Sequence, residues 1–248
     1  MLSEPDEASR RELEIREAEA SQYEERYTSQ HGSWFTGVEV AVLRAALALK
    51  PSDVLADFGC GTGRITRALA PYCRRVVAID RSHQSLEILR KRAKADGLEN
   101  ISPVEADLTK AMTIEAEVTK AVCVEVLQHV LTPEGRGTVV ENIGRSLVPG
   151  GRCGIVNENY GIVRQIRGRP REVRGGGALF FHTFTSSELR SLLTSAGLRP
   201  RRMLGCGVLY WSRYRFAPRA LAVLDEWAAL LPGAERVAKF SAVIGEKT

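Results

Sequence analysis

The sequence lacks a long hydrophobic run. No stretch approaches the roughly 18 apolar residues that a membrane-spanning helix requires, because Arg44 interrupts the most apolar candidate, residues 38–49. The first twenty residues are acidic and helical in character, which fits neither a signal peptide nor a transit peptide. From these absences we expect a cytoplasmic protein that has no contact with a membrane.

The sequence also lacks paired cysteines. Its five cysteines are widely spaced and form no Cys-x-x-Cys motif. An odd number at such spacing argues against a disulfide framework and against structural zinc. Cys60, Cys123 and Cys153 lie in apolar or glycine-rich runs typical of buried strands. We therefore expect free, mostly buried thiols and no metal site.

Basic residues are unevenly distributed over the 248 residues, whose net charge is +5. Residues 1–30 hold four arginines and nine acidic residues, whereas residues 160–220 hold twelve arginines and two acidic residues. This asymmetry predicts either a basic face near an anionic partner or a solvated arginine surface. Arginine outnumbers lysine 28 to 7 throughout, so the preference for arginine is not specific to this region.

Short β-like runs alternate with amphipathic segments from about residue 53 onward. This alternation predicts an α/β fold with a doubly wound, mostly parallel sheet. A Pro at the first helical position (Pro133) and a capping box from Thr185 to Glu188 support the helix boundaries. The expected strands are residues 54–58, 76–80, 101–106, 121–126 and 152–157, and the expected helices are 64–72, 82–96, 134–147 and 188–196.

Two segments interrupt this alternation. Residues 1–50 are helical in pattern and precede the first strand, so we expect an N-terminal helical arm or lid before a main domain of residues 51–248. Residues 160–181 contain Pro170 and the three consecutive glycines 175–177. Such a composition predicts a mobile basic loop beside the site that the sheet creates.

A glycine-rich loop gives the strongest signal. An apolar strand runs through Asp57 into Gly59-Cys-Gly61-Thr-Gly63 and then into a helix that begins at Arg64. Glycines permit a positive φ and a close approach of ligand to backbone, and the helix N-terminus presents unpaired amides. The spacing is neither the GxGxxG of dinucleotide-binding proteins nor a Walker A loop.

Two further acidic residues end the next strands. Asp80 closes the apolar run 75–80, and Asp107 follows the third run. Ligands of open α/β sheets bind at the carboxyl ends of the strands, where Asp57, Asp80 and Asp107 all fall. An acid after the second strand is suited to ribose hydroxyls, and one after the third to an adenine amino group.

With these motifs the sequence resembles the class I S-adenosylmethionine-dependent methyltransferases. The segment 57–63 is similar to their first motif, Val77–Asp80 to their ribose-binding motif and Glu105–Leu108 to their adenine-contacting turn. Residues 123–130 resemble their fourth strand and the following turn, and residues 147–151 the turn before their fifth strand. The resemblance implies a seven-stranded sheet with one reversed strand, with final strands at 201–210 and 239–246 joined through a helix at 219–231.

The resemblance also implies which residues hold S-adenosylmethionine. The three glycines would pass its methionine end, Asp57 would hold its amino group and Arg64 its carboxylate, while Arg81 and Leu108 would enclose the adenine. Tyr27, on one helical face with Tyr23, is the preferred contact of the N-terminal lid. The full set is Asp57, Gly59, Gly61, Gly63, Arg64, Asp80, Arg81, Asp107, Leu108, Glu125 and Tyr27.

Methyl transfer needs an aligned nucleophile and, where that nucleophile must lose a proton, a base. Our candidate catalytic residues are His182, His129 and Glu158, and our candidate substrate contacts are Asn159, Tyr160 and Arg164. The chain lacks the Asn/Asp-Pro-Pro-Tyr motif of amino-adenine and amino-cytosine methyltransferases after its fourth strand. Cys123 lacks the context of the activated cysteine in pyrimidine C5 enzymes.

These features predict a methyltransferase that acts on an oxygen or nitrogen of a small, anionic molecule met by arginines of residues 164–174. A peptide or protein amine methyltransferase is the alternative, because His129 and Asn159 resemble features of the α-N-terminal enzymes. A third reading is an inactive, cofactor-binding accessory protein. Nucleic-acid binding is disfavoured, because the basic stretch lacks dense aromatic residues. The oligomeric state is left open.

Overall fold

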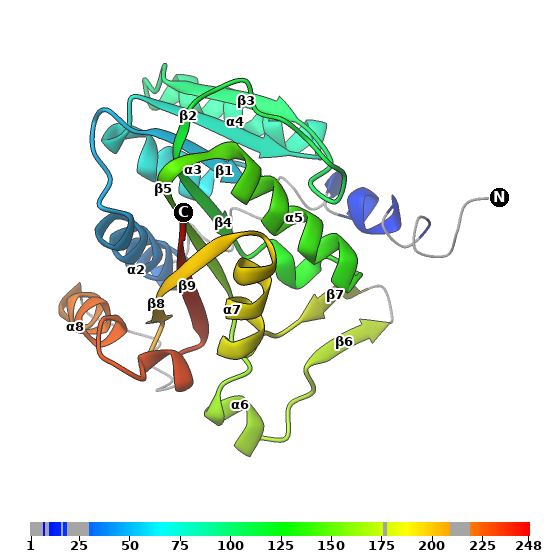
Figure 1. Cartoon of the computed structure of the whole chain (residues 1–248), viewed down its shortest axis with the longest axis vertical. Helices are drawn as coiled ribbons and strands as arrows, with labels where there is room; N and C mark the ends of the chain where they lie inside the picture. The colour runs from blue at the N-terminus through cyan, green and yellow to red at the C-terminus, as the bar shows by residue number, and fades with distance from the viewer. Residues whose placement is uncertain (1–6, 8–9, 16, 19–29, 176–177, 209–218) are drawn as a thin grey trace.

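Seven strands form one mixed sheet in the computed structural model, in the order β3-β2-β1-β4-β5-β9-β8 (Figure 1). Strands β1 to β5 are parallel to one another, and β9 is antiparallel to both β5 and β8. This confirms the predicted fold class. The strands are β1 (Val54–Phe58), β2 (Arg75–Asp80), β3 (Ile101–Glu105), β4 (Val118–Val124), β5 (Leu147–Glu158), β8 (Leu198–Cys206) and β9 (Phe240–Lys247).

The structure describes residues 7, 10–15, 17–18, 30–175, 178–208 and 219–248, with the backbone alone for 30–35, 174–175, 178–179 and 219–223. Among these residues no helix is both long and apolar enough to cross a membrane. All five cysteines are free and buried, as predicted. Burial raises the pKa of the Cys73 thiol to about 11.

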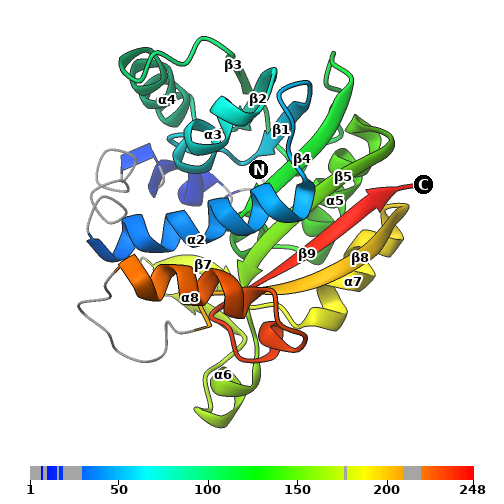
Figure 2. The ribbon, with the colours of Figure 1, turned by 90° about the vertical axis from the view of Figure 1, so that its left-hand side faces the viewer.

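Helices cover both faces of the sheet. Apolar side chains of α2, α3 and α8 pack with Val76 on one face, and Leu86 and Leu89 of α4 join the same face through Ala78. Side chains of α5 and α7 pack on the other face, so α2 and α8 lie in front of the sheet and α5 and α7 behind it in Figure 2. The helices are α2 (Gln30–Leu47), α3 (Arg64–Leu69), α4 (His83–Ala95), α5 (Pro133–Ser146), α7 (Ser186–Ser195) and α8 (Arg219–Ala229).

The predicted loop at residues 160–181 is largely regular structure, so that prediction is wrong. It contains the short helix α6 (Ile162–Ile166) and an antiparallel hairpin of β6 (Glu172–Gly175) and β7 (Ala178–His182). Arginine and glycine suggested a loop, but the cross-strand pairs Glu172–His182 and Val173–Phe181 hold the two strands together. Phe180 and His182 of β7 are buried. The hairpin is therefore fixed to the domain.

Short 3-10 helices complete the connections between these elements. They are η1 (Ala70–Tyr72), which extends α3, η2 (Leu127–His129), which follows β4, and η4 (Ala234–Arg236), which precedes β9. Of the expected N-terminal arm, α2 and the short helical segment 10–15 are described. The element η2 matters most for function, because it lies at the carboxyl end of the sheet, beside the glycine loop.

Candidate active site

A cavity of about 840 Å³ opens at the carboxyl ends of β1, β2 and β4. This volume falls within the roughly 300–1,000 Å³ typical of small-molecule sites. Its walls come from the glycine loop, the tips of β2 and β4, the loop after β3, η2 and the N-terminal segment. The predicted site residues that line it are Asp57, Gly59, Gly61, Arg64, Asp80, Arg81, Asp107, Leu108, Glu125 and His129.

The glycine loop has the left-handed backbone that its composition predicted. Gly59, Gly61 and Gly63 have φ angles of 81°, 52° and 87°. A Cβ on Gly59 would come within 2.3 Å of the Val126 side chain, and one on Gly63 within 2.2 Å of Leu89. Gly63 is not among the residues that line the cavity. It is required for the packing of α3 against α4, whereas Gly59 and Gly61 form the cavity wall.

The three strand-end acids face one cavity but differ in their partners. Asp57 is buried and accepts a hydrogen bond from the Thr66 hydroxyl at 2.6 Å. Its burial raises its pKa to about 6. The Asp80 carboxylate accepts the amide N–H of Gly61 at 2.8 Å and that of Ser82 at 2.9 Å. Asp80 thus ties the glycine loop to the end of β2.

Asp107 is held in the loop after β3. It accepts hydrogen bonds from the Thr109 hydroxyl at 2.6 Å and the Thr109 amide at 3.0 Å. Burial alone would raise the pKa of Asp107, but these hydrogen bonds and the nearby Lys110 and Arg81 hold it below its ordinary value. The carboxylate is therefore an ionised acceptor at neutral pH.

Arg64 lies at the cavity wall between two glutamates. Its guanidinium donates to Glu39 of α2 and, at 3.0 Å, to Glu125 after β4. Thr36 accepts a third hydrogen bond at 3.2 Å. Glu125 has a φ of 59°, uncommon for a residue with a side chain, and its amide donates to the Val156 carbonyl at 2.8 Å. The Arg64 side chain is consequently held in one orientation.

His129 lies in the cavity wall at the end of η2. Its Nδ1 is 2.9 Å from the carbonyl oxygen of Phe180, so Nδ1 must carry the hydrogen in that bond. Its Nε2 lies 3.3 Å from the Gln128 amide nitrogen. Gln128 in turn accepts the Glu158 amide hydrogen at 2.9 Å. This chain of hydrogen bonds connects β5, η2 and β7. In the neutral ring the lone pair is on Nε2, where it accepts the hydrogen bond from the Gln128 amide.

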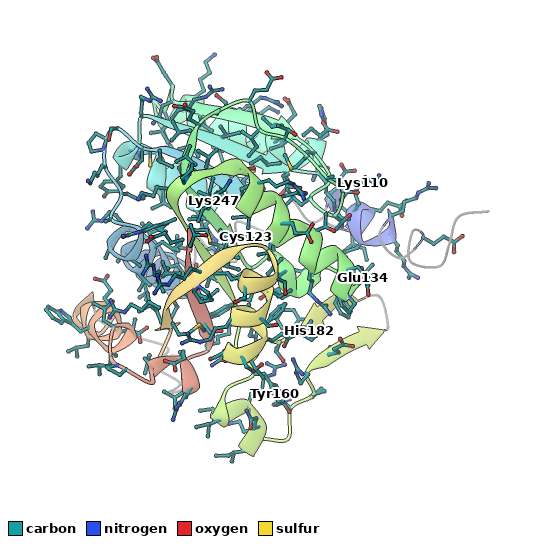
Figure 3. All side chains as sticks on the ribbon, in the orientation of Figure 1. Lys110, Cys123, Glu134, Tyr160, His182 and Lys247 are labelled. Atoms are coloured by element: carbon teal, nitrogen blue, oxygen red, sulfur yellow. The ribbon has the colours of Figure 1, made fainter. Side chains whose placement is uncertain are left out.

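The structure does not bring His182 to the cavity. Its side chain is buried, with Nδ1 3.0 Å from Glu172 and Nε2 2.9 Å from Glu188. The Phe184 ring packs edge-on against it at 4.6 Å. Figure 3 shows His182 between the hairpin and α7, apart from the cavity-lining Lys110. His182 therefore joins the hairpin to α7.

The predicted catalytic residue Glu158 and the three predicted substrate contacts lie beyond the cavity lining. Glu158 accepts a hydrogen bond from Arg164 at 2.6 Å, and its burial raises its pKa. The Asn159 amide donates to the carbonyls of Glu235 and Ala238, inside the protein. Tyr160 lies under the Arg171 guanidinium, 5.5 Å from its ring centre. Asn159 thus packs β5 against η4, and the roles predicted for all four residues stay predictions.

The N-terminal arm contributes to the cavity through residues that the sequence did not single out. Arg10, Glu12 and Leu13 line it, and Glu12 lies 3.9 Å from Arg81. Tyr27 lies outside the described residues. The helical segment therefore closes the cavity on the side of Arg81, and the contact predicted for Tyr27 stays a prediction.

Two buried residues near the site were also missed by the sequence interpretation. Gln128 orients His129, and Glu39 holds Arg64. Glu39 carried a signal, because it is the one acidic residue in the apolar run 38–49. A single charge on a buried helix face requires a partner. Gln128 carried no comparable signal, because a glutamine after a strand is ordinary surface composition.

Comparisons with known proteins agree with this site. A family model described as a methyltransferase domain matches residues 55–151, the segment that contains the glycine loop and all three acids. A probable cobalt-precorrin-6B C(15)-methyltransferase (decarboxylating) of Methanothermobacter thermautotrophicus is 39% identical over 80 residues, which are 31% of this chain and 41% of that protein. A ubiquinone biosynthesis O-methyltransferase of Coxiella burnetii is 28% identical over 125 residues, 50% of this chain and 51% of that protein. The matches thus span about half or less of these curated relatives.

The fold is shared with solved methyltransferase structures over nearly the whole chain. The 1,6-didemethyltoxoflavin-N1-methyltransferase of Burkholderia thailandensis was solved with 1,6-didemethyltoxoflavin and S-adenosylhomocysteine bound. It superimposes with a TM-score of 0.69 at 20% sequence identity, over 100% of this chain and 92% of that one. At this identity the likeness concerns the fold.

Proposed function

We propose that the chain is a class I S-adenosylmethionine-dependent methyltransferase, whose cavity binds S-adenosylmethionine and which methylates an oxygen or nitrogen of a small molecule. One observation carries the proposal. Asp57 and Asp80 lie at the carboxyl ends of β1 and β2, Asp107 follows the adjacent parallel strand β3, and all three line a single cavity with the glycine loop. The volume and the acceptor groups fit a ligand with an amino group, ribose hydroxyls and an adenine.

The residues present divide the cofactor between them. Asp80 would accept from the ribose hydroxyls, Asp107 and Leu108 would meet the adenine, and Asp57 would receive the amino group. Arg64 would pair with the carboxylate. The cofactor supplies a methyl group on a sulfonium sulfur. The protein's own tasks are to align the acceptor with that methyl, exclude water and, where needed, accept a proton.

His129 is the candidate base that the geometry favours. Of the three predicted catalytic side chains, it is the one in the described cavity lining. Its Nδ1 hydrogen is committed to the Phe180 carbonyl, so the lone pair is on Nε2, which would exchange its hydrogen bond from Gln128 for the acceptor's proton. In that step the acceptor's O–H or N–H bond breaks while its new bond to the methyl carbon forms and the carbon–sulfur bond breaks.

The small-molecule acceptor is supported by the Burkholderia neighbour, whose own substrate is a small heterocycle. The anionic character of the acceptor stays a prediction. Arg164 holds Glu158, and Arg171 holds Glu188, so these two arginines already have carboxylate partners within the protein. Lys239 lies near both clusters, because its charge lowers the pKa of Glu39 and of Glu158. The sequence interpretation did not consider it.

The decisive experiment is calorimetry with S-adenosylhomocysteine. We expect binding by the wild-type protein and at least about a tenfold weaker affinity for Asp80→Ala, since hydrogen bonds to a charged group contribute about 1.5–3 kcal/mol. Asp96→Ala is the matched control, because Asp96 is partly exposed and pairs with Arg67 away from the cavity. Equal affinities for the wild type and Asp80→Ala would contradict the assignment of the cavity.

A second experiment tests the acceptor. Radiolabelled S-adenosylmethionine is incubated with the protein and, separately, with a small-metabolite extract and with a peptide pool. Label in the metabolite fraction supports the proposal. Label in peptides alone would replace the small molecule by an amine of a peptide, and binding without transfer to either pool would favour an accessory role.

A further inference from the structure

Glu39 is a fully buried acid on a helix that the matched methyltransferase segment does not include. It has 0% exposure, lies on α2, and is flanked by the apolar residues Val38 and Val40. The matched segment begins at residue 55, after α2 has ended. Burying an ionised acid costs several kcal/mol unless it is paired or protonated. Glu39 is paired with Arg64, so the role of this pair is the question.

The guanidinium of Arg64 is shared by two carboxylates. One terminal nitrogen donates to Glu39 and Thr36, and the other donates to Glu125. The side chains of Arg64, Glu39 and Glu125 are 9%, 0% and 11% exposed. Both ends of the guanidinium are thereby fixed at the cavity wall, and α2 is connected to the glycine-loop helix and to the end of β4.

Of the three side chains in this cluster, Glu39 is the one whose pKa lies near neutral pH. Burial and the neighbouring Glu125 raise its pKa, Arg64 and Lys239 lower it, and the balance is about 7. The other charged or titratable groups beyond Arg64, Glu125 and Lys239 are Cys206 of β8 and, next to Cys206, Asp225 of α8. Oε1 of Glu39 has no hydrogen-bond partner among the described residues. That oxygen can carry a proton while Oε2 keeps its contact with Arg64.

We propose that Glu39 is a positioning residue that holds Arg64 for the cofactor's carboxylate and takes up a proton when that carboxylate arrives. The inference rests on the proposed function. A third anion beside Arg64 disfavours the charged form of the nearest buried acid. Protonation of Glu39 then frees part of the guanidinium's charge for the ligand, while Glu125 keeps its hydrogen bond.

Calorimetry in two buffers of different ionisation enthalpy measures this proton uptake. With S-adenosylhomocysteine at pH 7.5, we expect the wild-type protein to take up about half a proton per bound ligand. Glu39→Gln keeps the shape of the side chain but cannot titrate, and we expect it to bind with proton uptake near zero. Glu141→Gln, at an exposed glutamate that pairs with Arg145, is the control and should behave as the wild type.

The outcomes separate this inference from the proposed function. Equal proton uptake by the wild type and Glu39→Gln, or proton release by the wild type, would overturn the role of Glu39. Absence of binding to the wild type would overturn the proposed function instead. If Glu39→Gln does not fold, the pH dependence of ligand binding by the wild-type protein still tests the inference. Its affinity should fall by up to about tenfold per pH unit above pH 7, and a flat profile from pH 6.5 to 8 would overturn the inference.

Discussion

Two regions of the molecule place a basic side chain between two carboxylates, with different results. Arg64 lies between Glu39 and Glu125 at the cavity wall, and His182 lies between Glu172 and Glu188 beside α7. The first cluster connects α2, α3 and the end of β4 around a site for a ligand. The second connects the β6–β7 hairpin to α7 and lies outside the cavity lining.

The two clusters differ in the burial of their carboxylates and in the side chain between them, an arginine in one and a histidine in the other. Glu39 is fully buried beside a cation that does not titrate, and its pKa rises to about 7. The Glu188 side chain is 28% exposed, and although burial raises its pKa, His182 and Arg171 hold it below the ordinary value. The same arrangement of side chains thus has two results. Glu39 at the cavity is an acid that can exchange a proton near neutral pH, whereas Glu188 at the hairpin stays ionised.

The largest expected effect comes from breaking the cavity cluster. Arg64→Ala leaves Glu39 and Glu125 without their shared cation, so we expect the free energy of unfolding at pH 7.5 to fall by about 3 kcal/mol. Arg67→Ala, one turn further along α3, removes a partly exposed pair with Asp96 and should cost less than about 1 kcal/mol. Urea denaturation measures both free energies. Equal losses would mean that the buried cluster contributes no more to stability than the partly exposed pair.

Turnover distinguishes His129 in the cavity wall from His182 in the hairpin cluster. We expect His129→Ala to lower turnover about a hundredfold at saturating substrate, because a general base contributes about 10²–10⁴. His182→Ala should change turnover by less than about twofold, since His182 lies outside the cavity lining. A hundredfold loss of turnover in His182→Ala, with turnover unchanged in His129→Ala, would reverse the assignment of the base.

Breaking the hairpin cluster should instead lower the stability of the protein. His182→Gln removes a group held by two carboxylates, and we expect the free energy of unfolding to fall by about 1–2 kcal/mol and tryptic cleavage after Arg167 and Arg171 to become faster. His83→Gln is the matched control, because His83 is exposed and meets a single carboxylate, Glu105, at 2.9 Å. Equal cleavage rates in the two variants would show that His182 does not fasten the hairpin.

Glu39 also contributes to the pH dependence of stability. Its pKa is raised in the folded state, so the folded protein binds more protons than the unfolded one between pH 4.5 and about 7. The free energy of unfolding should therefore fall as the pH rises through this range. Glu39→Gln should flatten the slope measured by urea denaturation, and Glu141→Gln should leave it unchanged. Asp57, with its pKa raised to about 6, keeps part of the slope in every variant.

The local parts of this molecule were predictable from the sequence. Residues 54–58 form β1 as predicted, and Asp57, Asp80 and Asp107 face one cavity, because strand, loop and helix follow one another within short stretches. The partners of Arg64 were not predictable, since Glu39 and Glu125 lie 25 and 61 residues away. The hairpin was missed because its strands are held by cross-strand pairs and not by their own propensities.

The position of β9 has a consequence for biosynthesis. It is the last of the seven strands in the chain, yet it lies between β5 and β8 and is the one sheet neighbour of β8 among the described residues. A nascent chain can pair β1 to β5 as each leaves the ribosome, but β8 has no strand to join until residues 240–247 have followed. A variant that stops before residue 240 would therefore lose two strands and expose the edge of β5, a template for aggregation.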